Sequence, residues 1–413
     1  MPTVVLMGTL DTKEVETLFV RDRLRSAGCD VVLVDVGVVG PAPAEADVGR
    51  DAVAASAGTT VADLIGRGDR SHAMEVMGRG AAEIVGRLLG EGRLDAVMAL
   101  GGSGGSSIAT AAMRSLPVGI PKLVVSTIAS GDIRAYVGQS DITMMYSVLD
   151  VSGLNSVSTR IFENAAAAAA GMAGVAAARV AGPSTREAVA VTMFGVTTPA
   201  ATTARQWLER QGYEVLVFHA NGAGGRSLEK LAGDGALAGV LDLTTTELAD
   251  ELVGGVLSAG PDRLEAAGQR GLPQVVSLGA LDMVNFGPFD TVPERFRGRR
   301  LHPHNAQVTL MRTTVAECRE LGHVLGRKLR GSRGATAVFL PRRGLSAMSE
   351  PGGTFHDAEA DAALFEALLQ ALPSTVEVVT ADCAINDPDF ATAMARRLHH
   401  LIQRQRAPSD AQG

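Results

Sequence analysis

A polar turn follows the first apolar run of the sequence, and its residues are of the types that hold phosphate. It reads Gly8-Thr9-Leu10-Asp11-Thr12-Lys13-Glu14. Gly8 permits close approach of the backbone, and the first turn of a following helix offers free amide groups and the positive end of its dipole to an anion. Two threonine hydroxyls and the ammonium of Lys13 add further donors. We therefore expect ligand contacts here, although Asp11 with Glu14 also fits an ordinary capping box.

A glycine-rich turn follows a second apolar run, DAVMAL. It reads Gly101-Gly102-Ser103-Gly104-Gly105-Ser106-Ser107. Four glycines within five positions leave the backbone free to form an anion-binding nest, at an entropic cost that calls for a function. The pattern predicts phosphate or carboxylate binding, and the alternative is a flexible connector. Neither turn has the GxxxxGK[ST] spacing of a P-loop or the GxGxxG spacing of a dinucleotide fold.

Hydroxyls and one carboxylate follow a third apolar run, KLVVST. The turn reads Ser126-Thr127-Ile128-Ala129-Ser130-Gly131-Asp132. Asp132 is suited to ribose hydroxyls or to a hydrated Mg²⁺ on the phosphates, because magnesium prefers oxygen ligands and keeps several waters. The alternative is that Asp132 only caps the next helix. Asp35 stands where dinucleotide folds keep a ribose-binding acid, but this spacing has low specificity.

The second half of the chain carries further polar motifs but no spacing that fixes a mechanism. Its titratable candidates for proton transfer or metal binding are His219, Asp242, Glu247, Asp282, His304 and His356. Of these, the catalytic candidates are His219, Asp282, His304 and His356. HExxH and GxSxG spacings are absent, so the metal ligands stay unknown. A lone histidine at a strand end is more often structural, but the crowding of polar groups predicts a second small-molecule site in this half.

Alternating patterns along the chain position these turns. Short β-branched runs, each followed by a turn and a longer helical pattern, are typical of βαβ units and a parallel sheet. The predicted strands of the first half are 3–7, 30–35, 95–100, 122–127 and 142–146, and its predicted helices are 13–27, 71–90 and 106–115. The predicted strands of the second half are 188–194, 214–218, 239–243, 274–278, 335–340 and 376–380. The polar turns thus lie at carboxyl ends of strands, where open α/β sheets bind ligands.

A break in the pattern divides the chain in two. The segment 180–187, VAGPSTRE, combines Gly-Pro with polar residues before a new strand. We place an N-terminal α/β nucleotide-binding domain at 1–183 and a C-terminal α/β domain with a substrate or effector site at 184–413. The predicted fold class is α/β, with two Rossmann-like open parallel-sheet domains facing a cleft. The segment 37–58 is expected to be a surface loop.

Composition limits the partners of the chain. Its 413 residues are too many for one compact core, and 46% apolar with 20% charged residues is an ordinary globular balance. A net charge of -7 without a basic cluster gives no footprint for nucleic acid or an anionic membrane. The three cysteines show no CxxC spacing, and the start lacks the regions of a signal peptide. We expect a cytoplasmic protein, in which the alanine-rich stretch 165–178 is a packed helix and not a membrane span.

Several motifs together resemble a known family. They are GTLDTKE, GGSGGSS, VSTIASGD, FGVTTP, VFHANGAGG, DLTTTEL, GALDMVNFGP, HPHNAQVTLMRTT and PGGTFHDAEAD, within residues 3–382. In this order they resemble a widespread bacterial family related to the ATP-binding, inhibitory N-terminal domain of a plant tobamovirus resistance protein. Two departures are Gly105, where a serine or threonine is common, and Ala306, where we would expect proline.

The resemblance implies a two-part α/β architecture, ATP with Mg²⁺ bound by the N-terminal part, and a homodimer. It carries nucleotide contact onto the positions of GTLDTK, GGSGG and ASGD, and so adds Ser130, Gly131 and Asp132 to the predicted contacts. We therefore expect an ATP-binding protein that is an ATP-dependent or nucleotide-regulated metabolic enzyme of unassigned substrate. Two alternatives stay open: a non-catalytic nucleotide-binding module acting as a dimer, and a nucleotide-independent hydrolase or isomerase that uses His304 or His356.

Overall fold

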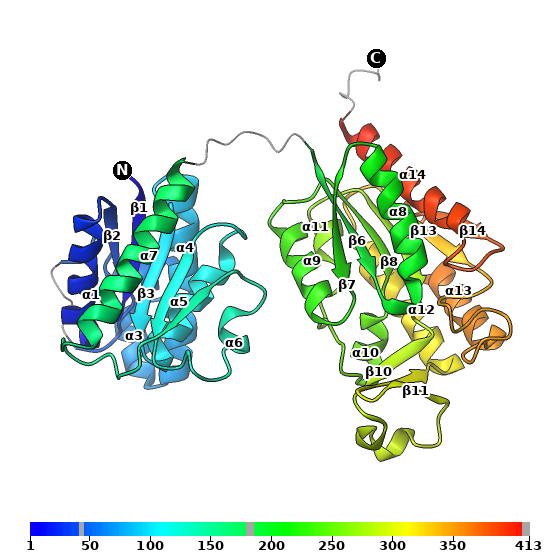
Figure 1. The fold of residues 1–413 in the computed structure, drawn as a ribbon, viewed down its shortest axis with the longest axis horizontal. Helices are drawn as coiled ribbons and strands as arrows, with labels where there is room; N and C mark the ends of the chain where they lie inside the picture. The colour runs from blue at the N-terminus through cyan, green and yellow to red at the C-terminus, as the bar shows by residue number, and fades with distance from the viewer. Residues whose placement is uncertain (41–44, 179–185, 407–413) are drawn as a thin grey trace. The chain divides into compact units, whose positions relative to one another are not determined.

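The computed structural model describes residues 1–40, 45–178 and 186–406. The chain divides into two compact units, Met1–Gly182 and Pro183–Gly413. The predicted boundary between residues 183 and 184 lies outside the described residues. Each unit contains a parallel sheet with helices on both faces (Figure 1), which confirms the predicted α/β fold class.

The N-terminal unit is built on a five-stranded parallel sheet, called sheet A, in the order β2-β1-β3-β4-β5. Its strands are β1 (Thr3–Gly8), β2 (Asp30–Asp35), β3 (Ala96–Gly101), β4 (Lys122–Ser126) and β5 (Thr143–Tyr146). Its helices are α1 (Leu10–Ser26), α2 (Arg50–Ser56), α3 (Val61–Arg67), α4 (Arg70–Gly90), α5 (Ser103–Ser115), α6 (Arg134–Val137) and α7 (Ser158–Ala178). All the predicted strands of this half are confirmed, and the α2 helix within 37–58 was missed.

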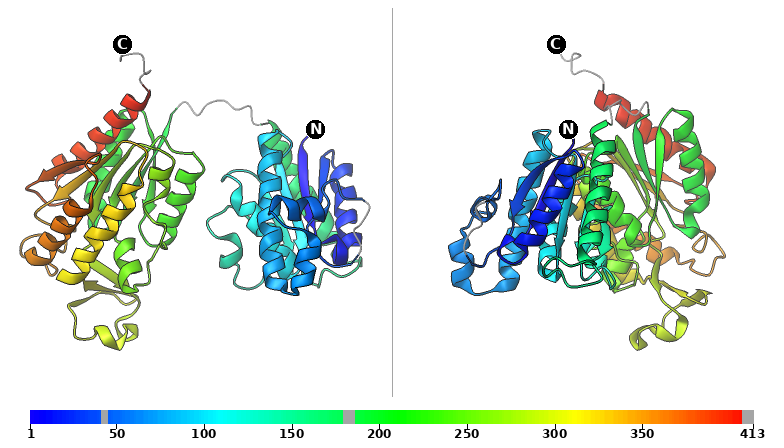
Figure 2. Two further views of the ribbon diagram at one scale, coloured as in Figure 1. Left: turned by 180° about the vertical axis from the view of Figure 1, so that it is seen from behind. Right: turned by 60° about the vertical axis from the view of Figure 1, so that its left-hand side comes forward.

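Both faces of sheet A are buried, which explains why its strands read as continuous apolar runs. Val5 and Met7 of β1 pack with α4 and α5 on one face, whereas Val4 and Leu6 pack with α1 and α7 on the other. The two helix layers are seen from opposite sides in Figures 1 and 2. The helices that follow β1 and β3 therefore cover opposite faces of the sheet.

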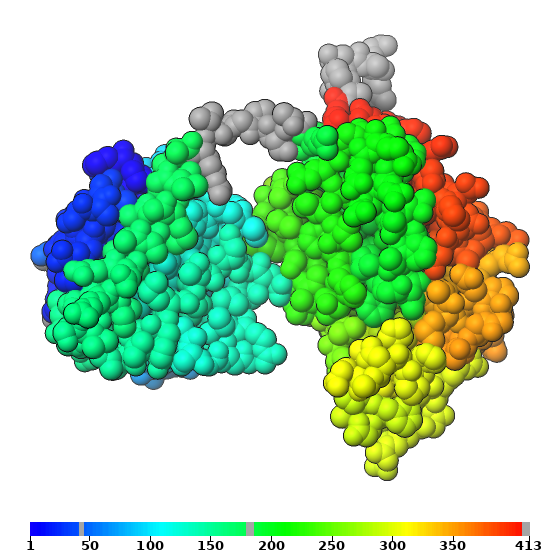
Figure 3. All heavy atoms as spheres, viewed as in Figure 1, coloured from blue at the N-terminus to red at the C-terminus, as the bar shows by residue number. Residues whose placement is uncertain are grey.

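Helix α7 is the one helix within the described ranges that is long and apolar enough to cross a membrane. It runs along the surface of the N-terminal unit (Figure 3), and Phe162, Ala166 and Ala173 are buried against sheet A and α1. The alanine-rich stretch thus packs as a helix of small residues on its sheet, as predicted.

The C-terminal unit is built on a six-stranded parallel sheet, called sheet B, in the order β14-β13-β9-β8-β6-β7. Its strands are β6 (Ala188–Met193), β7 (Glu214–His219), β8 (Gly239–Thr244), β9 (Gln274–Gly279), β13 (Thr336–Pro341) and β14 (Glu377–Ala381). Its helices are α8 (Thr198–Arg210), α9 (Ala223–Gly233), α10 (Glu247–Val253), α11 (Ala266–Gln269), α12 (Val315–Arg330), α13 (Ala358–Ala371) and α14 (Pro388–Arg406). Helices α8 and α14 cover one face, and α9 to α13 lie on the other.

A three-stranded antiparallel sheet, which the sequence patterns did not predict, projects beyond the carboxyl ends of sheet B (Figures 1 and 3). Its strands are β10 (Met283–Phe286), β12 (Val308–Arg312) and β11 (Leu301–Asn305). Sequence analysis gave this stretch as the motifs GALDMVNFGP and HPHNAQVTLMRTT, in which Asn285 and Arg312 stand among apolar residues. Both side chains are buried and hydrogen-bonded inside the unit, and Pro303 lies in the edge strand β11, where a missing amide is tolerated.

Candidate functional site

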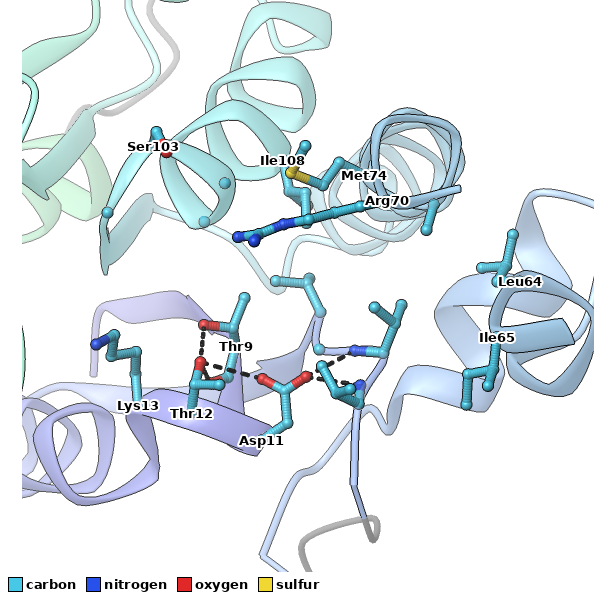
Figure 4. A pocket seen from close by; sticks show the side chains of 18 of the residues that line it. Thr9, Asp11, Thr12, Lys13, Leu64, Ile65, Arg70, Met74, Ser103 and Ile108 are labelled. Atoms are coloured by element: carbon cyan, nitrogen blue, oxygen red, sulfur yellow. Dashed lines mark hydrogen bonds between the residues drawn. The ribbon is translucent and has the colours of Figure 1, made fainter. Parts of the chain in front are cut away.

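A pocket of about 550 Å³ lies at the carboxyl ends of β1, β2 and β3. Its walls come from the turn after β1, the segment after β2, the glycine-rich turn at the start of α5, and helices α3 and α4 (Figure 4). Because α1 and α5 cover opposite faces, the pocket lies at the point where the strand order of sheet A reverses. Ligands of open α/β sheets bind at this point.

Most of the first two predicted turns line this pocket. The lining members are Thr9, Asp11, Thr12, Lys13, Gly102, Ser103, Gly104 and Gly105. Gly8 and Gly101 do not line it, because they are the last, buried residues of β1 and β3. A Cβ atom on Gly8 would lie 2.6 Å from Oγ1 of Thr17, so this glycine lets α1 pack closely on β1. The two turns thus meet at one pocket, because β1 and β3 are adjacent and parallel.

Asp11 holds the wall of the pocket together. Its Oδ2 accepts hydrogen bonds from the amides of Val38 and Val39, at 2.9 and 2.8 Å. Our capping-box interpretation was wrong, because the N-cap of α1 is Thr9 and its side chain makes no capping hydrogen bond. The Asp11 carboxylate instead fixes the segment after β2, which forms one side of the pocket.

Asp35 is also structural. Its side chain is buried, and Oδ1 accepts hydrogen bonds from the amides of Leu10 and Gly37 while Oδ2 lies 3.4 Å from Nε of Arg50. Burial raises the pKa of this carboxyl. Asp35 does not line the pocket, so the comparison with a ribose-binding acid was wrong for this residue. Its hydrogen bonds connect the turn after β1 to the segment after β2.

Two cations face the pocket without a protein partner. Lys13 lies beside the threonines of the first turn, and the guanidinium of Arg70 extends into the space between Thr9 and the start of α5 (Figure 4). Across the described residues, neither side chain makes a hydrogen bond or an ion pair. The pocket's two carboxylates are engaged: Asp11 as above, and Asp69 with the amide of His72, which lowers its pKa. Lys13 and Arg70 are therefore the charged groups of the pocket that stay free to bind a ligand.

Arg70 is a site residue that sequence reasoning missed. It is the first residue of α4, and Nη2 lies 3.5 Å from where a Cβ on Gly104 would be. No spacing in the sequence marks it, because the packing of α4 on α5 brings it over the glycine-rich turn. Asp69, the N-cap residue before it, is the one feature of the sequence that marks this position, and it predicts a helix start but no ligand.

The opposite end of the pocket is apolar, and this end was also missed. Leu64 and Ile65 of α3 lie far from Lys13 and Ser103 in Figure 4. Val39 and Ile65 are more than half exposed, at 59% and 56%, although both are large apolar side chains. The pocket thus has a polar, cationic end and an open apolar end.

The third predicted turn lies outside the residues that line the pocket. Ser126 connects it to the second turn, because its Oγ is 2.6 Å from Oγ of Ser106. Asp132 is exposed and bonds the amide and the guanidinium of Arg134, which lowers the pKa of its carboxyl to about 2. Ser130 and Gly131 also do not line the pocket.

The catalytic candidates of the second half do not form one site. His219 ends β7 and packs edge-on against Phe194, whereas His304 is exposed in β11. Asp282 is fully buried, accepts a hydrogen bond from Ser346 Oγ at 2.7 Å, and has its pKa raised by burial. His356 lines a pocket beside α13.

Asp242 and Glu247 belong to a buried ion-pair cluster. Arg263 is 1% exposed, and its guanidinium donates to Asp242 at 2.5 and 2.7 Å and to Glu247 at 2.6 Å. The same Glu247 carboxylate accepts the amides of Gly222 and Gly225. These acids therefore join β8, α9 and α10, and the hypothesis that they act in proton transfer is not supported by their surroundings.

Comparison with known proteins gives matches over nearly the whole chain. The N-terminal domain model of the uncharacterised protein family UPF0261 matches residues 2–178, and the C-terminal domain model of the same family matches residues 186–402. A UPF0261 protein of Clostridium tetani is 50% identical over 97% of this chain and 99% of its own length. A UPF0261 protein of Mesorhizobium japonicum is 45% identical over 96% of this chain and 98% of its own length.

A plant protein is also similar. The ToMV resistance protein Tm-1(GCR237) of Solanum lycopersicum is 45% identical over 72% of this chain, which corresponds to 40% of the plant protein. These matches confirm the resemblance drawn from the motifs. Among solved structures, a glycosyltransferase of Streptomyces sp. SF2575 complexed with thymidine diphosphate is 12% identical and covers 98% of this chain and 100% of its own. Its TM-score of 0.17 is too low for this likeness to carry an argument.

Proposed function

Because this chain belongs to the UPF0261 family and is related to the tomato Tm-1 proteins, we propose that its N-terminal unit binds Mg-ATP in the pocket between the turns after β1 and β3. The observation that carries the proposal is that Lys13 and Arg70, which have no hydrogen-bond or ion-pair partner among the described residues, line the same pocket as a glycine-rich helix start. Phosphate oxygens would accept charge-assisted hydrogen bonds from both side chains and bonds from the first amides of α5.

The glycine-rich turn supports a phosphate position. Gly102 is the N-cap of α5 with φ of -81° and no side-chain cap, so the first amides of this 13-residue helix are open to an anion. A Cβ atom on Gly102 would meet only Oγ1 of Thr127, at 3.8 Å. Neither the backbone nor protein packing requires glycine here, whereas a closely approaching phosphate does.

The apolar end supports a position for the base. Val39, Leu64 and Ile65 offer an open aliphatic surface, without an aromatic ring. The pocket volume of about 550 Å³ is within the range of small-molecule sites. A nucleotide whose phosphates lie by α5 and whose base lies by α3 matches both ends of the pocket.

The pocket residues fit a magnesium ion that is carried by the nucleotide. The described part of the chain has no cluster of three or more His, Cys, Asp or Glu side chains suited to a metal. Hydroxyls of Thr9, Thr12 and Ser103 line the polar end. Since Mg²⁺ usually binds phosphates and retains several waters, these hydroxyls would complete its shell. Removing Mg²⁺ with a chelator should weaken ATP binding and leave the Tm of the nucleotide-free protein unchanged.

Calorimetric titration of Mg-ATP into three variants tests the proposal. Lys13→Ala and Arg70→Ala each remove a charge-assisted bond, of roughly 1.5–3 kcal/mol, so each Kd should rise about 10- to 150-fold. Gly102→Val should block phosphate approach without disturbing packing. Arg79→Ala, on the same helix as Arg70 but paired with Glu75 outside the pocket, is the matched control. Wild-type affinity in all three pocket variants would remove this pocket from consideration.

A contact between the third predicted turn and the nucleotide is a separate part of the proposal. The family resemblance assigns it to Ser130, Gly131 and Asp132, although these residues do not line the pocket. Asp132→Ala would weaken Mg-ATP binding if the turn contacts the nucleotide. An unchanged affinity would restrict the site to the first two turns.

Turnover distinguishes the two functional classes that remain. An ATP-dependent enzyme would hydrolyse ATP or transfer phosphate when its metabolite is present. A non-catalytic module would show no turnover across a metabolite panel, and ATP would shift its sedimentation toward a homodimer.

A further inference from the structure

A second pocket, of about 350 Å³, lies in the C-terminal unit between helix α13 and the ends of β13 and β14. One face of α13 lines it through residues with helical spacing, namely Ala358, Asp361, Ala362, Phe365, Glu366 and Leu369. The opposite wall is Leu340 with the two residues that follow β13, beside β14 (Figure 1). The pocket is thus at the carboxyl edge of sheet B, where parallel sheets bind ligands.

Two arginines form the cationic side of this pocket. The amide of Arg342 donates to the carbonyl of Ala381 and the amide of Arg343 to that of Cys383, at 3.0 and 2.9 Å, so both main chains are fixed beside β14. Their side chains are exposed and, in the part of the chain that the structure describes, make no hydrogen bond or ion pair. Because the main chain holds both arginines in place and their guanidinium groups are unpaired, each can bind a carboxylate through two parallel N–H···O hydrogen bonds.

The remaining polar groups are held by the protein. Asp361 is 6% exposed, and its Oδ1 accepts a hydrogen bond from Nη2 of the buried Arg312 at 2.5 Å. His356 donates from Nδ1 to the carbonyl of Ser349 at 3.2 Å, because a carbonyl can only accept. This tautomer leaves Nε2 of His356 as the acceptor of the neutral ring.

The balance of charges selects the ligand class. Because Asp361 is paired with Arg312, Glu366 and the two arginines leave one positive charge in the pocket, which a monoanion balances and a phosphate dianion exceeds. Phe365 and Leu369 supply an apolar surface, and Leu369 is 49% exposed. We propose that this pocket binds a small organic monocarboxylate, with its carboxylate on Arg342 and Arg343 and its carbon body against α13.

Calorimetric titration of the full-length protein tests this proposal with benzoate and butyrate as probes. Benzamide and butyramide have the same shapes without the charge, and inorganic phosphate tests the other anion class. We expect saturable binding of at least one carboxylate at one site per chain, no binding of its amide, and weaker binding of phosphate. Because the site lies in the other unit from the nucleotide pocket, the outcome does not depend on ATP binding.

Variants locate the binding. Arg342→Gln and Arg343→Gln should each weaken the carboxylate about tenfold or more. Ala362→Phe should abolish binding by filling the pocket from an exposed helix position, without a change of charge. Arg319→Gln, an exposed arginine of α12 outside the pocket, is the matched control. The arginine variants change exposed side chains, so they keep the test valid if the phenylalanine variant does not fold.

Three results would overturn the proposal. The first is the absence of saturable binding of both carboxylates to the wild-type protein. The second is carboxylate binding that Arg342→Gln and Arg343→Gln leave unchanged. The third is stronger binding of inorganic phosphate than of either carboxylate, which would assign the pocket to a different anion class.

Discussion

The hydrogen bonds of Asp11 give the most direct test of how the nucleotide pocket is built. Its Oδ2 accepts the amides of Val38 and Val39 at 2.9 and 2.8 Å. Asp11→Ala removes both bonds and leaves the segment after β2 without this anchor. Asp11→Asn keeps one carbonyl oxygen and loses the charge. The prediction is that the segment opens more readily in the alanine variant, with an intermediate effect in the asparagine variant.

The magnitude follows from the type of bond. A hydrogen bond to a charged group contributes roughly 1.5–3 kcal/mol. Because Asp11 is half-exposed, solvent screening favours the lower value, about 1.5 kcal/mol for each amide. This corresponds to about tenfold faster hydrogen exchange at Val38 and at Val39 if both amides exchange through local opening.

Hydrogen exchange followed by NMR at the two amides, without nucleotide, is the assay. Asp30→Ala is the matched control, because Asp30 is exposed at the opposite end of β2 and its side chain bonds to nothing in the described residues. Unchanged exchange at Val38 and Val39 in Asp11→Ala would refute the structural role of this carboxylate. If exchange rises but Mg-ATP affinity stays the same, the segment after β2 does not contribute to nucleotide binding.

Two further predictions concern stability. Burial raises the pKa of Asp250 to about 7, above its ordinary value of 3.8, so the folded state binds this proton more tightly than the unfolded chain. The stabilising contribution of this proton is present below about pH 4 and is lost as the pH rises to about 7. In urea unfolding, Asp250→Asn should remove this pH-dependent part of the free energy of unfolding. The same dependence of unfolding free energy on pH in both proteins would contradict the prediction. Asn285, whose Oδ1 has no hydrogen-bond partner among the described residues, can turn its amide to accept from the new asparagine. Gly225→Ala would place a Cβ 2.1 Å from Oε2 of the buried Glu247, and it should lower the free energy of unfolding by about 1–3 kcal/mol. The control is Gly233→Ala, which lies in open space on the same helix and should leave the free energy of unfolding unchanged. Equal midpoints of the two variants in chemical denaturation would contradict the prediction.

The order of strands and turns was predictable from the sequence because it depends on local patterns. Both sheets consist of short apolar runs separated by turns and helices, and every predicted strand was confirmed. The sequence places the first two phosphate-type turns after strands, but they meet at one pocket because β1 and β3 are adjacent and parallel, which the order of strands along the chain does not give. The motifs also identified the family, because long exact strings in a fixed order are specific.

Tertiary structure decided which of the polar residues face a ligand. Asp35, Asp242 and Glu247 were all candidates by residue type, yet each carboxylate is used by backbone amides or a buried arginine, since a buried charge is costly without such partners. Conversely, Arg70 and the pair Arg342 and Arg343 had no signal in the sequence. Their cationic groups line pockets because helices and strands distant in the chain pack beside them, and such contacts between segments leave no periodic pattern in the order of residues.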